Sequence, residues 1–323
     1  MGNKKMSEDY SRILFNPNIS LDEMCKKIVG RENLFKYQSF YNTSNRKRTK
    51  NQYWEKNMIG EFHLCRGCEF EDRNDCKPFI NPLLVHRIIL QFVDANPTIN
   101  VIELIKTLNT EISDKYLQSV IDNYQTDIRI GCFTARNDNE KMWAKYSDIG
   151  RGYCIEYDTS KNVLFQQATL PVYYDDRPYD SSTTLANEII LEAVKKAKGR
   201  TDEENFEIFK SAYEKILKTA YIPLFIKQKG KWDFEEEQRM FILKRRTTSW
   251  GKLNMRDVLN QNSNIDLSQS IKSIYLGPRF ESLPNHKKIL QKINSITPST
   301  VNLYQIRIVN KKYINERIQR EKI

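Results

Sequence analysis

The segment that most constrains the fold of this chain is residues 132–158, CFTARNDNEKMWAKYSDIGRGYCIEYD. It begins as a short apolar strand, passes through a charged turn and starts a helix around Met142–Trp143. Gly150 and Gly152 then mark a turn before a second apolar strand over residues 153–157. This alternation predicts a mixed fold in which helices and strands share one core.

Length and composition indicate a soluble globular protein. The chain has 323 residues, which is enough for one large domain or two modest ones. Charged residues make up 29% and hydrophobic residues 39%, so we expect a thick polar surface. The aromatic share of 11% is too high for a disordered chain.

The net charge of +11 comes from several short basic clusters, which are residues 46–50, 195–200, 227–231, 244–246 and 311–312. Such clusters attract nucleic acid or anionic cofactors. They are equally typical of an ordinary solvated surface, so charge alone leaves both interpretations open.

The amino terminus lacks the apolar segment of a secretory signal, and no apolar run approaches the length of a membrane span. We expect a cytoplasmic protein without membrane contact, with its six cysteines reduced.

Four potential metal ligands lie close together in the sequence, namely His63, Cys65, Cys68 and Cys76. Their number suits a zinc site. However, His63 and Cys65 would share one face of a strand, and no second Cys-x-x-Cys follows. We therefore expect no metal and favour ordinary thiols around a strand and its turn, with the zinc alternative left open.

The apolar spacing predicts strands at both ends of the chain and helices between them. We expect helices over 20–29, 82–93, 100–108, 113–124, 182–198 and 202–219, and strands over 34–37, 59–65, 128–133, 152–157, 168–174, 237–243, 271–276 and 301–309. The segment 42–52 is expected to be a basic loop. This order indicates an α+β fold with a mixed, mostly antiparallel sheet.

The predicted organisation has three parts. Residues 1–32 form a polar, helical extension, and residues 311–323 form a basic tail. Between them we expect a single α+β domain over 33–310, with helical insertions near 80–125 and 180–220.

Two short segments carry polar residues in a strand context. In LFKYQSF, residues 34–40, alternation places Lys36 on one face and Tyr37 and Ser39 on the other. In WDFEEEQRMF, residues 232–241, it places three charges on one face. Such charges are costly to bury unpaired, so this face is either solvated or lines a polar site.

Four segments in order, LFKYQSF, CFTARNDNEKMWAKYSD with GRGYCIEYD, KGKWDFEEEQRMFI and IKSIYLGPRF, resemble the bacterial family designated domain of unknown function 2971. The resemblance covers about residues 33–310, and its central and W-x-x-E-x-E-x-R blocks are specific. Gln38 stands where the family has arginine, and Lys145 where it has histidine. Residues 70–75 also depart from the family's second motif.

The order of these motifs is similar, more weakly, to that of ADP-ribosyltransferases. This resemblance implies an ADP-ribosyltransferase-like sheet core and NAD as the substrate. Glu237 would stabilise the positive charge that builds on the ribose as the nicotinamide bond breaks. Glu235 would orient the acceptor, and Arg239 would keep the carboxylate ionised. A structural ion pair between Glu237 and Arg239 is the competing interpretation.

The same resemblance implies the residues that hold the cofactor. Lys36, Tyr37 and Ser39 would contact NAD, and Trp143 or Tyr146 would pack beneath it. For Trp143, a place in the core is the competing interpretation.

Three functions therefore compete. The first is an NAD-consuming ADP-ribosyltransferase-like enzyme in bacterial phage defence or toxicity, with a macromolecular acceptor for which the basic surface favours nucleic acid. The second is a nucleic-acid-binding protein or metal-dependent nuclease in which Glu235, Glu237 and Asp75 hold the metal. The third is a non-enzymatic sensor. The sequence has no Gly-rich phosphate loop, which argues against a P-loop or Rossmann enzyme.

Overall fold

The computed structural model describes residues 9–16, 19, 21–27, 32–44, 47–72, 74–95, 125–126, 128–196, 222–243 and 264–323. The chain divides into two compact units. Unit 1 comprises residues 1–28, 66–128 and 172–229, and unit 2 comprises residues 29–65, 129–171 and 230–323. The predicted helices over 100–108, 113–124 and 202–219 lie outside the described residues.

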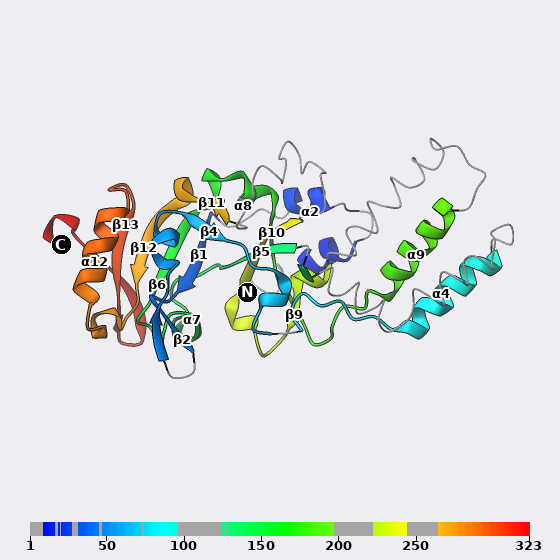
Figure 1. The fold of residues 1–323 in the computed structure, drawn as a ribbon, viewed down its shortest axis with the longest axis horizontal. Coiled ribbons are helices and arrows are strands. Elements are labelled where there is room, and N and C mark those ends of the chain that lie inside the picture. Colours follow the sequence, from blue (N-terminus) through cyan, green and yellow to red (C-terminus); the bar gives the residue numbers. More distant parts are fainter. Residues whose placement is uncertain are drawn as a thin grey trace. The chain divides into compact units, whose positions relative to one another are not determined.

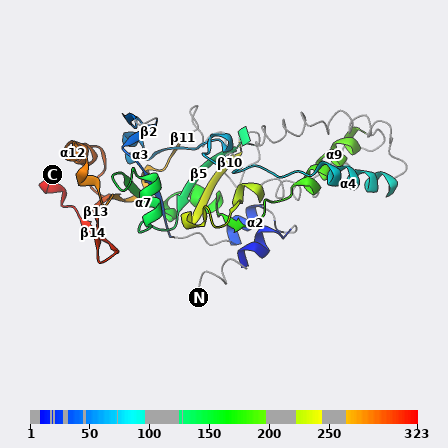
Figure 2. The same cartoon turned by 90° about the horizontal axis from the view of Figure 1, so that it is seen from below.

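An eight-stranded sheet forms the frame of unit 2, in the order β14-β13-β12-β6-β1-β5-β10-β7. The strands are β1 (Asn33–Gln38), β5 (Ile128–Thr134), β6 (Tyr153–Asp158), β7 (Thr169–Pro171), β10 (Glu237–Leu243), β12 (Ile271–Leu276), β13 (Asn302–Val309) and β14 (Lys312–Arg317). β12 and β13 pair in parallel, whereas β1 with β6, β6 with β12, and β7 with β10 pair antiparallel. β5 and β10 lie side by side near the centre of Figure 2. The α+β class and the mostly antiparallel sheet are thus confirmed.

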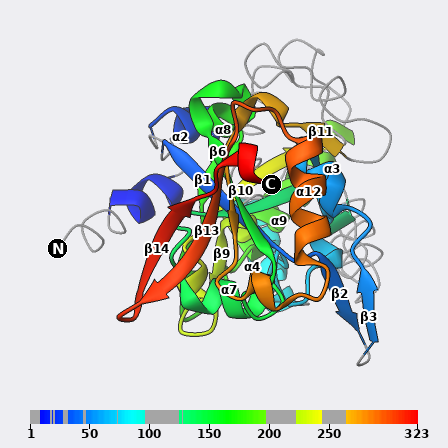
Figure 3. The same cartoon turned by 90° about the vertical axis from the view of Figure 1, so that its left-hand side faces the viewer.

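One face of this sheet carries the main apolar core of unit 2. Leu34, Ile155 and Ile274 from three neighbouring strands belong to it. The helix α12 (His286–Ile296) adds the buried side chains Ile289 and Ile293 from its apolar stripe. Burying each of these side chains contributes about 1.5–3 kcal/mol, which holds the helix on the sheet (Figure 3).

The opposite face carries a smaller aromatic cluster. Tyr37, Cys154 and Tyr275 face it from β1, β6 and β12, and Trp143 covers it from helix α7 (Glu140–Tyr146). Tyr37 is paired with Cys154, and Lys36 with Ile155 of the main core. Because alternate residues of a strand point to opposite faces, the two clusters lie on opposite sides of one sheet.

Several elements differ from the sequence-based expectation. Residues 42–52, expected to be a loop, contain most of a hairpin of β2 (Tyr41–Ser44) and β3 (Lys47–Lys50). Within the expected basic tail, residues 312–317 form the edge strand β14. The sequences YNTS, KRTK and KYINER of these strands are mostly polar, so they lack the regular apolar alternation that signals a strand. The predicted strand over 168–174 is divided into β7 and β8 (Tyr173–Asp175), which belong to different sheets.

Unit 1 contains a pair of packed helices, α4 (Pro82–Ala95) and α9 (Ser182–Lys196), which lie side by side in Figure 1. Val85 and Ile89 of α4 pack with Leu185 and Ile189 of α9. The unit also contains α2 (Leu21–Lys27) and the parallel pair of β8 with β9 (Ile226–Gln228). None of the helices in the described ranges has the length and apolar character required to cross a bilayer.

Candidate functional site

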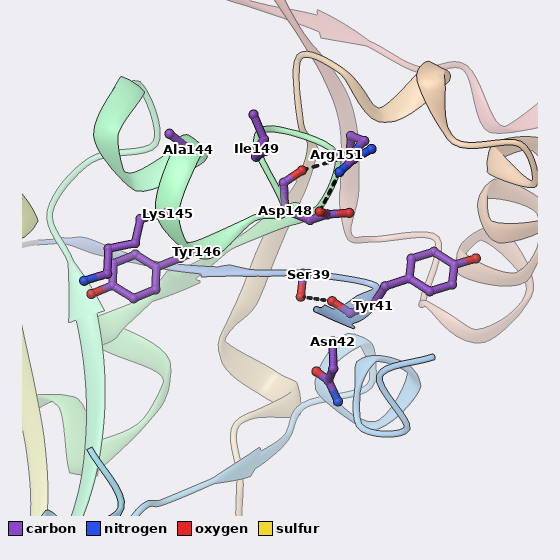
Figure 4. A pocket seen from close by; sticks show the side chains of 9 residues that line it. All are labelled: Ser39, Tyr41, Asn42, Ala144, Lys145, Tyr146, Asp148, Ile149 and Arg151. Atoms are coloured by element: carbon purple, nitrogen blue, oxygen red, sulfur yellow. Dashed lines mark hydrogen bonds and ion pairs between the residues drawn. The ribbon is translucent and has the colours of Figure 1, made fainter. Parts of the chain in front are cut away.

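A pocket of about 500 Å³ lies in unit 2 beside the carboxyl end of α7. Its lining comes from the end of β1, the start of β2, the last turn of α7 and the turn that follows, with the residues Ser39, Tyr41, Asn42, Ala144, Lys145, Tyr146, Asp148, Ile149 and Arg151 (Figure 4). Its volume falls within the range of about 300–1,000 Å³ that is usual for small-molecule sites.

The helix α7 is fixed in place by bonds at its first turn. The Asn139 side chain accepts a hydrogen bond from the Met142 backbone N–H and so caps the helix. The Trp143 indole N–H donates to the Asn137 carbonyl over 2.8 Å. The Trp143 ring meets that of Tyr37 edge to face, with centroids 4.8 Å apart. Trp143 and Tyr37 therefore form the buried base on which α7 rests.

The turn after α7 forms another wall of the pocket and needs an unusual backbone. Asp148, Ile149 and Gly150 all have positive φ, at 51°, 55° and 77°. Arg151 Nη2 lies 2.8 Å from Asp148 Oδ1, which braces the turn from within. Gly277 accepts no larger residue, because an added Cβ would overlap the Gly150 carbonyl. The two motifs GRGY and LGPRF are thus packed directly against each other.

Tyr146 connects the pocket with a buried carboxylate. It lines the pocket, and its hydroxyl donates a hydrogen bond to Glu235 Oε1. Glu235 ends the short helix η4 (Asp233–Glu235) and is only 4% exposed. Burial, and then the Glu235 charge, raise the pKa of the Tyr146 hydroxyl well above its usual range, so Tyr146 remains a neutral donor.

Glu237 and Arg239 form a buried ion pair on β10, which follows η4. Arg239 Nε lies 2.9 Å from Glu237 Oε1, and the two side chains are 0% and 4% exposed. Cys132 of β5 lies beside them, and burial followed by the Glu237 charge raises the pKa of its thiol. The competing interpretation of Glu237, an ion pair with Arg239, is therefore realised in the fold.

Lys36 is directed to the other face of the sheet. Its Nζ donates to the Cys132 carbonyl over 2.9 Å and lies 5.7 Å from the Phe62 ring centroid. Met240 of β10 belongs to the same main core as Phe62. Strand alternation then places Arg239, the neighbour of Met240, on the opposite face from Lys36.

Ser39 is at the pocket, where its hydroxyl donates to the Tyr41 carbonyl over 2.6 Å. Gln38, which stands in the place of the family's arginine, points elsewhere. Its side-chain oxygen accepts a hydrogen bond from the Tyr153 hydroxyl over 2.8 Å.

The structure therefore brings together only part of the predicted site. Ser39 and Tyr146 share the pocket, and Glu235 is reached through Tyr146. Sequence reasoning did not select the basic pocket residues Lys145 and Arg151. Arg151 lies within the GRGY motif, and Lys145 is the position that departs from the family pattern, so both carried a signal.

Lys145 also joins the two specific motifs. Its Nζ lies 3.6 Å from the Trp232 ring centroid and 5.4 Å from that of Tyr146. Such cation–π contacts contribute about 0.5–2 kcal/mol, and here they hold the segment before η4 against α7.

The thiols considered for zinc differ in their surroundings. Cys76 is buried, with its Sγ 3.4 Å from Asp75 Oδ1, whereas Cys68 is exposed. In unit 2, His63 Nδ1 lies 2.8 Å from the Asn264 side-chain oxygen.

Residues 142–240 match the model of a family described as protein of unknown function, DUF2971. The matched segment begins within α7 and ends within β10, so it contains Tyr146, Glu235 and the buried ion pair. No curated protein and no solved structure is significantly similar to the chain.

Proposed function

We propose that the protein binds NAD in the pocket beside α7 and cleaves its nicotinamide–ribose bond, as an ADP-ribosyltransferase-like enzyme. The observation that carries the proposal is the position of Tyr146, which lines the pocket and donates its hydroxyl hydrogen to the buried Glu235. A carboxylate separated from a pocket of suitable size by a single side chain is available to a ligand that displaces that side chain.

The proposed reaction breaks the bond between ribose C1′ and the nicotinamide nitrogen, and the bonding electrons leave with nicotinamide. Positive charge then develops on the sugar, where a nearby carboxylate stabilises it. We assign this role to Glu235 rather than Glu237, because Glu235 is bonded directly to Tyr146, which lines the pocket. The acceptor attacks C1′ and releases its proton to Glu235, and Arg239 holds Glu237 ionised behind it.

The pocket also has the charge that a dinucleotide requires. Lys145 and Arg151 line it, with Asp148 as the single acidic lining residue. Arginine and lysine are the usual partners of phosphate groups. In this proposal Arg151 gives up part of its hydrogen bonding to Asp148 and binds the pyrophosphate instead. That the sheet core is of the ADP-ribosyltransferase type is part of the same proposal.

The test is calorimetric titration of the purified protein with NAD, followed by measurement of nicotinamide release. We expect Arg151→Gln to weaken NAD binding, and Glu235→Gln to bind NAD while losing nicotinamide release. The control is Lys161→Gln, which removes an equal charge from an exposed site outside the pocket. A folded wild-type protein that neither binds NAD nor releases nicotinamide would contradict the proposal and favour the nucleic-acid-binding or sensor alternatives.

A further inference from the structure

A basic surface borders the pocket within unit 2. It is formed by the β2–β3 hairpin, the helix α3 (Trp54–Met58) and the helix α12. The described side chains of these elements include five lysines, Lys50, Lys56, Lys287, Lys288 and Lys292, and one acidic residue, Glu55. Lys56 is paired with Glu61, 3.0 Å away, so the excess charge comes from the other four lysines. We call it the hairpin–α12 surface.

Glu55 joins the parts of this surface. Its Oε1 lies 2.9 Å from Lys50 Nζ on β3, and its Oε2 lies 3.5 Å from Lys292 Nζ on α12. Tyr41 of β2 makes a second connection, because its hydroxyl donates to the Asn285 side chain over 2.8 Å at the start of α12. The hairpin and the helix therefore lie next to each other, as Figure 3 shows.

The charge of this surface is far from balanced. The side chains of Lys50 and Lys292 are 65% and 47% exposed, although both share Glu55. Lys287 and Lys288 are also exposed, and neither has an ion-pair partner among the residues that the structure describes. The bond from Lys50 lowers the pKa of Glu55, so its single negative charge persists and leaves the lysines in excess.

We infer that the hairpin–α12 surface binds the phosphate backbone of a nucleic acid. Several exposed cations spread over two adjacent elements match a polyanion with regularly spaced charges better than a single small anion. A two-stranded ribbon such as β2–β3 also has the size of a nucleic-acid groove.

The surface continues into the pocket, because Tyr41 and Asn42 of β2 line it. A nucleic acid held by the hairpin is thus placed beside the bound NAD. This position identifies nucleic acid as the class of acceptor for the ADP-ribosyl group, an inference that rests on the proposed function. An oxygen or nitrogen of the nucleic acid would attack C1′ and lose its proton.

The experiment is fluorescence anisotropy of the full chain with labelled duplex DNA, single-stranded DNA and single-stranded RNA of about 20 nucleotides, in salt of about 50–200 mM. We expect Lys287→Ala/Lys288→Ala to weaken binding at least about tenfold at the lowest salt. The negative slope of log affinity against log salt concentration should become shallower, by about 0.9 per lost phosphate contact for duplex and about 0.7 for single strands.

The matched control is Lys312→Ala/Lys322→Ala, which removes the same charge from exposed residues at the carboxyl end of the chain. An equal loss of affinity in both pairs would mean that only net charge matters, and would overturn the inference. Equally tight binding of poly-glutamate would overturn it in favour of an acidic protein partner.

NAD titration and nicotinamide release separate this inference from the proposed function. Lys287→Ala/Lys288→Ala should retain both. NAD turnover without nucleic-acid binding would overturn only the hairpin–α12 assignment. Nucleic-acid binding that is weakened by Lys287→Ala/Lys288→Ala but not by the control pair, without NAD turnover, would support the surface and overturn the proposed function.

Discussion

Arg239 joins Glu237 by two hydrogen bonds along a single strand, with Nε 2.9 Å from Oε1 and Nη2 3.2 Å from Oε2. Both side chains are almost fully buried. A bidentate bond of this type fixes the carboxylate in position as well as in charge. Glu237 therefore contributes to the stability of the fold, and any catalytic role must be measured separately from it.

Glu237→Gln should lower the free energy of unfolding by about 3–5 kcal/mol, because it leaves the Arg239 charge buried without its counter-charge. Urea denaturation followed by circular dichroism measures the change. The double variant Glu237→Gln/Arg239→Met should lose less than the sum of its single variants, since both charges are removed together. A loss below about 1 kcal/mol in the single variant would show that other groups compensate Arg239.

Tyr146→Phe should lower the free energy of unfolding by about 1–3 kcal/mol, because Glu235 loses a hydrogen-bond donor in a buried position. The same variant should bind NAD at least as tightly, since no bond to Glu235 has to be broken. Thermal unfolding and calorimetry check the two effects. Tyr304→Phe is the control, because it removes a hydroxyl from a half-buried tyrosine outside the pocket.

Gly277→Ala should destabilise the protein by about 3 kcal/mol or more, because the added Cβ meets backbone atoms of Gly150 that cannot move aside. Gly230→Ala should cost only about 1–2 kcal/mol, because its surroundings are open and only its φ of +79° is unfavourable. Equal losses in the two variants, measured by urea denaturation, would contradict the close packing of the GRGY and LGPRF turns.

Arg307 should make a small, acid-sensitive contribution to stability. Its Nη1 and Nη2 each lie 2.8 Å from an oxygen of Glu281, and these bonds lower the pKa of that carboxyl. A lowered pKa in the folded state gives stability that is present above the unfolded-state pKa and is lost as the pH falls through the folded-state value.

Because the pair is partly exposed, with side-chain exposures of 41% and 54%, Arg307→Gln should cost at most about 1 kcal/mol at neutral pH. The difference from wild type should shrink towards zero between about pH 5 and pH 3, as Glu281 is protonated. Denaturation curves at a series of pH values test this. A difference that grows on acidification would contradict it.

The sequence predicted strands correctly where side chains alternate between a solvent-exposed face and a packed face. β1, β6, β10 and β12 were all predicted within a few residues, because each has at least one apolar face. β2, β3 and β14 were missed, because their sequences YNTS, KRTK and KYINER are mostly polar and do not alternate between apolar and polar residues. Their strand structure depends on the pairing of each with a neighbour, which a local pattern does not contain.

The candidate site was predictable in part for a related reason. Strand alternation correctly placed Lys36 and Tyr37 on opposite faces of the sheet, but it does not reveal where the pocket lies. Ser39, which lines the pocket, follows the end of β1 and is not placed by alternation. Tyr146 contacts Glu235 across 89 positions of sequence, and this contact arises only when α7 packs beside η4. The pocket itself depends on the left-handed turn at Asp148–Gly150, for which only the glycine gave a local signal.

The strand order has a consequence for how the protein is made. Tyr37 of β1 pairs with Cys154 of β6, and Cys154 pairs in turn with Tyr275 of β12, so successive neighbours are 117 and 121 positions apart (154 minus 37 and 275 minus 154). At a synthesis rate of about 5–20 residues per second, β1 leaves the ribosome roughly 6–23 seconds before β6. Strands that pair over such separations assemble slowly. The nascent chain must therefore keep β1 from aggregating until the centre of the sheet has been translated.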